Sequence, residues 1–240
     1  MRQIGEGSYA TVFKCYDYFY ETHFALKRAK RDLNDKDLER FKQEFNYTRE
    51  LNSPYIIKVF KFDASNNEYI MEYVDKTLYG YINENNTKLP IEQRVSIIKQ
   101  ILKGFEYIHS KGYLHRDISA SNILIKKYDD VIVAKISDLG LLKVPDSQLT
   151  SLNTEVKGVL NDPSLVHEGF GNYKIIHETY ALTKLIYFIL TGKSNIRIIK
   201  DSNLRAFVEK GISDNKDDRY SSIAEMREAL GVYVTEITTQ

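Results

Sequence analysis

The sequence predicts an α+β fold in two parts, an antiparallel sheet with one helix followed by a mostly helical region. Up to Val74 the apolar residues fall mainly in short runs rich in β-branched and aromatic side chains, which are typical of strands. One stretch in this part, 34–51, has apolar residues at helical spacing, and after Asn83 this spacing dominates. We therefore expect a small part over residues 1–74 and a larger part over 75–240, which together form one domain.

The composition is typical of a globular protein. Its 240 residues, 42% of them hydrophobic, are enough for a substantial core. The formal net charge of +1 gives no reason to expect a nucleic-acid surface, and no apolar run reaches the length of a membrane span. The single cysteine, Cys15, excludes an intrachain disulfide and is compatible with a reducing, cytoplasmic location.

The first motif is a glycine-rich stretch, GEGSYA at 5–10, in which Ala10 stands at the place of a third glycine. The run that follows, 11–16, is strand-like and shows no helical period, so a dinucleotide-binding turn before a helix is disfavoured. A strand–loop–strand hairpin remains, whose backbone N–H groups can approach phosphates where side chains would obstruct. Because the motif begins at Gly5, we expect the strand before it to be nearly absent.

A lysine and a glutamate are predicted to form an ion pair in the small part. Lys27 ends the strand-like run 22–27, where a lone lysine would ordinarily be a solvated edge residue. Glu44 lies on the apolar face of the helix predicted at 34–51, which Asn34 is placed to cap. A carboxylate on an apolar face needs a partner unless it lies at the helix edge, and Lys27 is the natural one.

The remaining elements follow from the same patterns. Runs 56–62 and 68–74 read as two strands joined by a turn at 64–67. Helical spacing predicts one helix over 90–111 and a buried central helix over 175–190.

A serine–glutamate pair at 222–225 has the spacing of a capping box and predicts the start of a last helix. We expect that helix to end at Gly231, since glycine commonly follows a helix end.

The stretch HRDISASN at 115–122 carries the strongest chemical signal, together with Asp138 after a short apolar segment. Phosphoryl transfer needs one carboxylate to accept from the attacking hydroxyl and further oxygen ligands for the metal ion at the phosphates. Asp117 suits the first role, and Asn122 and Asp138 suit the second. Each residue alone would read as an ordinary loop or turn residue, but their combination and order disfavour that interpretation.

In this order the glycine stretch, lysine, helix glutamate, catalytic loop and second acid resemble the eukaryotic-type protein kinase family over nearly the whole chain. The resemblance implies a two-lobed kinase fold with lobes at 1–74 and 75–240. It also implies ATP with Mg²⁺, or Mn²⁺, as cofactor and a protein hydroxyl as acceptor, with serine or threonine favoured over tyrosine.

The resemblance assigns roles to individual residues. Asp117, Lys27, Glu44, Asn122 and Asp138 would be catalytic, with Asn122 and Asp138 holding the metal. ATP would be bound by Ile4, Gly5, Gly7, Ser8, Val12, Ala25, Lys27, Met71, Leu124 and the backbone groups of Glu72 and Val74.

The resemblance also predicts regulation through the loop 141–162. Arg116 and Lys143 would receive a phosphate there, by autophosphorylation in trans or through a regulatory partner. The available acceptors are Ser147, Thr150, Ser151 and Thr154.

Several residues depart from the family pattern. Leu139 replaces a phenylalanine and keeps the position apolar, whereas Ser119 replaces a lysine near the γ-phosphate. Ser164 stands where a glutamate usually pairs with the arginine at Arg219, so that partner is expected to be missing. At the start of the central helix, glutamate replaces aspartate and threonine replaces glycine, at Glu178 and Thr183.

These departures leave two alternatives beside a protein kinase. One is a kinase-fold binding or regulatory module without catalysis, and the other is a phosphotransferase that acts on a small molecule. Arg116 beside Asp117 favours a protein kinase over the second.

Overall fold

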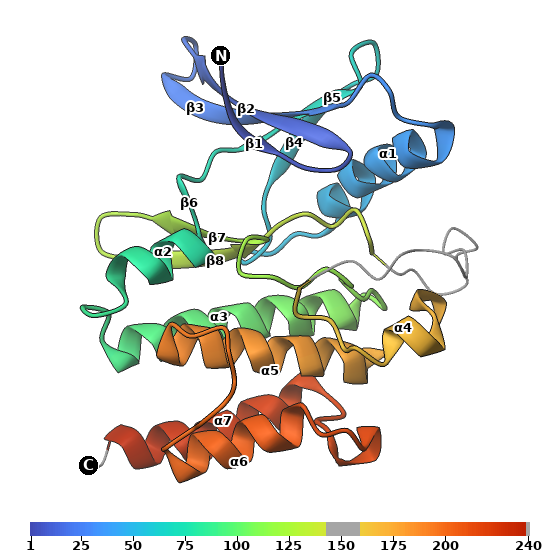
Figure 1. The fold of residues 1–240 in the computed structure, drawn as a ribbon. Coiled ribbons are helices and arrows are strands. Elements are labelled where there is room, and N and C mark those ends of the chain that lie inside the picture. Colours follow the sequence, from blue (N-terminus) through green and yellow to red (C-terminus); the bar gives the residue numbers. More distant parts are fainter. Residues whose placement is uncertain (143–158, 239–240) are drawn as a thin grey trace.

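The computed structural model describes residues 1–142 and 159–238, with side chains described up to Gly231. A five-stranded sheet with one helix lies above a helical region, and a three-stranded sheet lies between them (Figure 1). The predicted α+β fold class is confirmed. None of the described helices is long and apolar enough to cross a membrane.

The N-terminal sheet is antiparallel, with strand order β1-β2-β3-β5-β4. β1 is a strand of five residues, so the expectation that the first strand would be nearly absent is wrong. Arg2 and Gln3 pair with Lys14 and Phe13 of β2, and this backbone pairing forms an edge strand although it buries little side-chain surface. The strands are β1 (Arg2–Glu6), β2 (Ala10–Asp17), β3 (Thr22–Ala29), β4 (Val59–Asp63) and β5 (Glu68–Glu72).

The strand predicted at 56–62 begins only at Val59. Ile56 instead forms an isolated parallel bridge with Ile136, and the Ile57 N–H donates to the Ile136 carbonyl at 2.9 Å. These residues therefore pair with the second sheet and connect the two parts of the chain.

Helix α1 (Asp35–Glu50) lies beside the sheet, as the apolar spacing predicts (Figure 1). The Asn34 side chain caps it by accepting from the Asp37 N–H at 2.9 Å. Phe41 and Phe45 are buried against Tyr69 of β5, with ring centroids 5.2 and 5.5 Å apart. This packing fixes the side of α1 that faces the sheet.

The C-terminal part is built on α3 and α5, whose apolar faces form the main core. The small sheet has the order β6-β7-β8 and is antiparallel. The helices are α2 (Leu78–Asn85), α3 (Ile91–Ser110), α4 (Leu165–Glu168), α5 (Ile175–Thr191), α6 (Ser202–Gly211) and α7 (Ile223–Thr238). The strands are β6 (Lys76–Thr77), β7 (Ile123–Lys127) and β8 (Ile132–Ile136), and short 3₁₀ turns occupy Phe170–Asn172 and Lys216–Asp218.

Two predicted helix ends have different outcomes. α5 stops before Gly192, whose φ of 71° is the left-handed conformation that suits glycine. α7 does not end at Gly231, contrary to expectation, and continues to Thr238. Glycine inside a helix costs about 1 kcal/mol relative to alanine, which weakens a helix without stopping it.

The start of α7 resembles the predicted capping box. The Ser222 hydroxyl accepts from the Glu225 N–H at 3.2 Å. The Glu225 carboxylate accepts from the Ser221 N–H at 2.8 Å, one residue before the position that a capping box predicts.

Helices α5 and α6 approach closely where Thr183 meets Gly211. A Cβ atom at Gly211 would lie 2.1 Å from the Thr183 hydroxyl oxygen. Gly211→Ala is therefore expected to destabilise the protein by about 1–3 kcal/mol through overpacking, measured by urea unfolding.

The matched control is Gly231→Ala, because a Cβ there meets no atom within 4 Å. That change is expected to stabilise by about 0.5–1 kcal/mol. In a Thr183→Gly background Gly211→Ala should cost less than in the wild type. An unchanged stability of Gly211→Ala would contradict the close approach.

Candidate active site

The structure brings all the predicted site residues to one cleft of about 930 Å³ between the N-terminal sheet and the helical part. The glycine stretch and β3 line one side, and the catalytic loop with β7 lines the other. The predicted nucleotide contacts Ile4, Gly5, Gly7, Ser8, Val12, Ala25, Lys27, Met71, Glu72, Val74 and Leu124 all belong to this lining.

Lys27 lies between two carboxylates. Its Nζ is 2.6 Å from Glu44 Oε1 and 3.3 Å from Asp138 Oδ1. Burial disfavours the ammonium, but Asp138 and Glu44 together raise the pKa of Lys27 well above its usual range. Lys27 in turn lowers the pKa of Asp138, whose side chain is about half exposed at 48%. The cleft therefore holds a fixed positive charge with one carboxylate still accessible.

Glu44 is oriented by a residue that sequence reasoning missed. The Tyr69 hydroxyl donates to Glu44 Oε1 at 2.7 Å, on the same oxygen that Lys27 contacts. Burial raises the pKa of Glu44, although Lys27 opposes this change. The second carboxylate oxygen lies 3.1 Å from the place of a Cβ at Gly140, so a larger residue at Gly140 would press on the glutamate. A buried carboxylate requires several donors, and this need was the available signal for Tyr69.

Arg40 is a second lining residue that the sequence interpretation overlooked. It lies one helical turn before Glu44 on α1, and its guanidinium is 3.5 Å from Asp37. Since residues four apart share one helix face, the spacing from Glu44 was the signal that could have found it.

The connection between the two parts is held by the Glu72 side chain. This carboxylate is buried, accepts from the Lys58 N–H at 2.9 Å and contacts the ammonium groups of Lys126 and Lys135, each at 2.8 Å. Burial opposes its ionisation, but the two lysines lower the pKa of Glu72. Only the backbone of Glu72 is thus available to a nucleotide, which agrees with the contact that was predicted.

Asp117 and Asn122 are held together within the catalytic loop. Asn122 Nδ2 donates to the Asp117 carbonyl at 2.8 Å and to its Oδ2 at 3.1 Å. His115 Nε2 lies 3.1 Å from the Ser137 carbonyl, which can only accept, so its Nδ1 is left to accept from the Asp117 N–H at 3.2 Å. The loop is therefore fixed on both sides of Asp117.

The residues proposed for metal binding present suitable donors. Because Asn122 uses its amide nitrogen on Asp117, its oxygen is the atom left for a cation. Asp138 offers an ionised carboxylate and has a φ of 59°, a strained value for a residue with a side chain. Hard divalent cations such as Mg²⁺ prefer these oxygen ligands.

Ser119 adds no charge to the cleft. Its hydroxyl accepts from the Asn122 N–H at 3.2 Å and so stabilises the turn of the loop. The lysine that the family pattern places here is not replaced by this residue.

The glutamate at the start of α5 supports the loop despite its departure from the family pattern. Glu178 is fully buried, accepts from the Arg116 N–H at 2.8 Å and contacts His109 Nε2 at 2.6 Å. Arg116 has a φ of 71°, and its guanidinium lies over the Phe170 ring and donates to the Phe170 carbonyl at 2.9 Å. Burial lowers the pKa of Arg116 to about 10.

Asp162 supplies the carboxylate that was expected to be missing for Arg219. The two buried side chains form an ion pair, so the function of a glutamate at Ser164 has moved two residues earlier. Asp162 also accepts from the Ser164 N–H at 2.9 Å, and the neighbouring Asn161 donates to the Arg116 carbonyl at 3.1 Å. The end of the loop is thereby joined to the catalytic loop.

The predicted phosphorylation sites fall outside the described residues. This applies to Lys143, Ser147, Thr150, Ser151 and Thr154.

Known proteins share this sequence pattern. Residues 1–229 match the protein kinase domain family. The chain is 33% identical over 159 residues to cell division control protein 2 homolog 2 of Trypanosoma brucei brucei, which covers 65% of this chain and 46% of that protein. It is 30% identical over 200 residues to probable serine/threonine-protein kinase PknB of Lactococcus lactis, with coverages of 80% and 31%.

A third relative, serine/threonine-protein kinase PrkC of Bacillus subtilis, is 28% identical over 200 residues, covering 80% of this chain and 30% of that protein. The matched region is thus less than half the length of these relatives. Because the family match spans nearly the whole chain and the motif residues meet in one cleft, the chain belongs to the eukaryotic-type protein kinase family.

Proposed function

We propose that the protein is an ATP-dependent protein kinase that transfers the γ-phosphate to a protein hydroxyl, with serine or threonine favoured. The observation that carries this proposal is the meeting of Lys27, Asp117, Asn122 and Asp138 in one cleft. The acceptor class is supported by the names of two relatives, which are called serine/threonine-protein kinases.

The chain's own residues suit the steps of the transfer. Lys27, oriented by Glu44 and Tyr69, places a positive charge for the α- and β-phosphates of ATP. Asp117, fixed by Asn122, would accept the proton of the attacking hydroxyl while the γ-phosphorus–oxygen bond to ADP breaks. Positioning and charge stabilisation would supply most of the rate.

Asn122 and Asp138 would hold Mg²⁺, for which Mn²⁺ could substitute. The cation would neutralise charge on the phosphates when bound. Its affinity is favoured because Lys27 lowers the pKa of Asp138, which keeps the carboxylate ionised at neutral pH.

The remaining assignments follow from the same proposal. Residues 1–74 and 75–240 would be the two lobes of one kinase domain, with ATP between them. The lone Cys15 requires no oxidising compartment, which supports a cytoplasmic location.

Regulation by phosphorylation of the loop 141–162 is part of the proposal. Arg116 would be a receptor for the phosphate, as the family pattern implies. Its guanidinium now contacts Phe170, so a phosphate would have to replace that contact.

The two alternatives are less well supported. A binding module without catalysis would not need Lys27, Asp117, Asn122 and Asp138 in working positions together. A small-molecule phosphotransferase is disfavoured by the similarity to protein kinases along the chain.

Incubation with labelled ATP, Mg²⁺ and generic protein substrates tests the function. The wild type is expected to label protein, and a chelator should stop the reaction. Glu44→Gln should lower kcat/KM by about 10²-fold, because Lys27 loses the charge that orients it. The matched control is Glu39→Gln, an exposed glutamate of the same helix, which should retain activity. A wild type that transfers no more label than Asp117→Asn would refute catalysis.

A further inference from the structure

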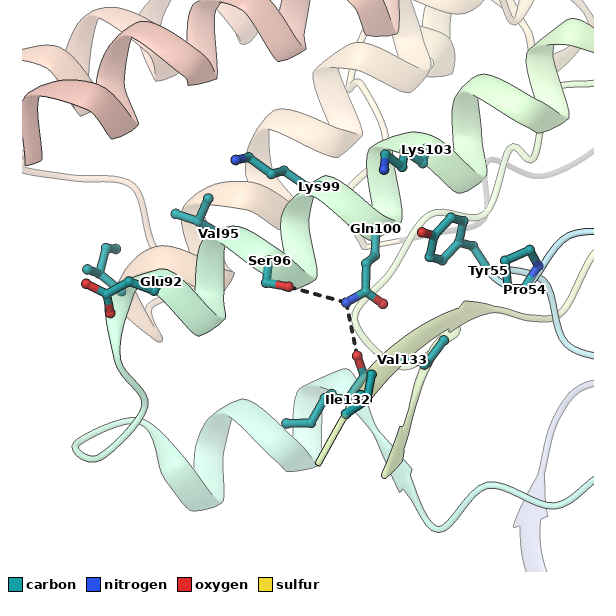
Figure 2. A pocket seen from close by; sticks show the side chains of 12 residues that line it. Pro54, Tyr55, Glu92, Val95, Ser96, Lys99, Gln100, Lys103, Ile132 and Val133 are labelled. Atoms are coloured by element: carbon teal, nitrogen blue, oxygen red, sulfur yellow. Dashed lines mark hydrogen bonds between the residues drawn. The ribbon is translucent and has the colours of Figure 1, made fainter. Parts of the chain in front are cut away.

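A second groove, of about 610 Å³, lies between α3 and the β7–β8 hairpin (Figure 2). None of its lining residues belongs to the catalytic cleft, so it is a separate feature of the surface. A groove of this size can receive a few side chains of a ligand.

The wall of the groove is largely apolar. Ile91 and Val95 contribute from α3, and Tyr55 lies at one end. Val131 and Val133 contribute from the hairpin, and Val131 is 55% exposed. An exposed apolar surface bordered by polar residues is typical of a binding site.

The edge of β8 in this groove is already occupied. Gln100 accepts from the Ala134 N–H at 2.9 Å and donates to the Ile132 carbonyl at 3.0 Å (Figure 2). Because the side-chain amide satisfies these backbone groups, a ligand cannot add a strand there without displacing it. Recognition would depend on side chains instead.

Two lysines on α3 border the groove. Lys99 and Lys103 are exposed and lie one helical turn apart, where like charges repel each other. Within the described residues the ion pairs of α3 are made by Glu106 and His109 and involve neither lysine. The single acid among the lining residues, Glu92, lies toward the start of the helix (Figure 2). The groove therefore combines an apolar wall with two uncompensated positive charges.

We propose that this groove is a docking site for a segment of a partner protein that combines branched apolar side chains with carboxylates. The apolar side chains would cover Val95, Val131 and Val133, and the carboxylates would pair with Lys99 and Lys103. Docking goes beyond phosphoryl transfer and requires no nucleotide, so it can succeed or fail independently of catalysis.

Fluorescence anisotropy with a labelled peptide of alternating leucine and aspartate tests the proposal. This probe is expected to bind the whole chain saturably and more weakly as salt is raised. Control peptides with lysine for aspartate, or serine for leucine, should bind about tenfold more weakly or worse. Absence of saturable binding, or equal binding of the lysine peptide, would overturn the proposal.

Variants locate the binding. Lys99→Glu/Lys103→Glu should weaken the acidic probe about tenfold or more, because attraction becomes repulsion. Lys193→Glu/Lys200→Glu makes the same change of net charge at exposed lysines outside the groove and should bind normally. Unchanged binding by the first double variant would reject this location.

Two further measurements complete the test. Val131→Asp alters an exposed apolar residue and should also weaken the probe, and unaltered binding by this variant would argue against the apolar contact. Sedimentation tests whether the groove binds a second copy of the chain, since self-association abolished by Lys99→Glu/Lys103→Glu would overturn the partner segment. ATP-induced thermal stabilisation should be wild-type in every variant, which separates this result from any failure of the nucleotide site.

Discussion

Asp117→Asn is expected to lower phosphoryl transfer by about 10²–10⁴-fold while ATP binding stays near the wild-type level. Asparagine has the same shape, and its oxygen can still accept from Asn122 Nδ2, so the loop should keep its conformation. It cannot take up the proton of the attacking hydroxyl, which is the role proposed for this carboxylate. The measurements are kcat for labelled ATP and the thermal shift that ATP induces.

The control is Asp129→Asn, which makes the same chemical change at an exposed position in the β7–β8 turn. It should leave both measurements unchanged. If Asp117→Asn retained the wild-type rate, the assigned role would be wrong and a binding module would be favoured. A loss of ATP stabilisation together with activity would instead show that the change disturbs the fold.

The elements that sequence reasoning predicted well are those whose signal is local. Helix α1 followed from apolar spacing and the Asn34 cap, both of which lie within one short stretch. Its pairing of Glu44 with Lys27 followed because a carboxylate on an apolar face needs an opposite charge. β1 was underestimated for the converse reason, since an exposed edge strand has little apolar pattern to detect.

The contacts that could not be predicted join residues distant in the sequence. Thr183 and Gly211 each look unremarkable alone, and only their close approach shows that the glycine makes room for the threonine. Tyr69 resembles any strand tyrosine until α1 is packed against it. Local patterns carry no information on such pairs, because tertiary packing decides which residues meet.

The ion pair of Asp162 with Arg219 has the largest predicted effect on stability. Both side chains are buried, with 2% and 5% exposed, so Asp162→Asn would leave the guanidinium without its carboxylate. Breaking a buried pair in this way costs about 3–5 kcal/mol of the free energy of unfolding. Denaturant unfolding at neutral pH measures the change.

The matched control is Glu168→Gln. Glu168 is 38% exposed and pairs with Lys216 near Asp162, but a partly solvated pair contributes only about 0–1 kcal/mol. A small effect of both variants would show that Asp162 does not carry the proposed load. A large effect of Asp162→Asn alone is the expected result.

The pH dependence of this difference identifies the carboxylate as its cause. Burial opposes the ionisation of Asp162, but Arg219 and Ser164 lower its pKa below the ordinary value of 3.8. A lowered pKa in the folded state means that the carboxylate stabilises the protein above pH 3.8 and loses this contribution as pH falls through the lowered pKa. Asparagine does not titrate, and the nearby His177 is common to both proteins. The gap in unfolding free energy between the wild type and Asp162→Asn should therefore stay constant from neutral pH down to about pH 4 and narrow below it. A gap that stays the same in stronger acid would assign the loss to packing rather than to charge.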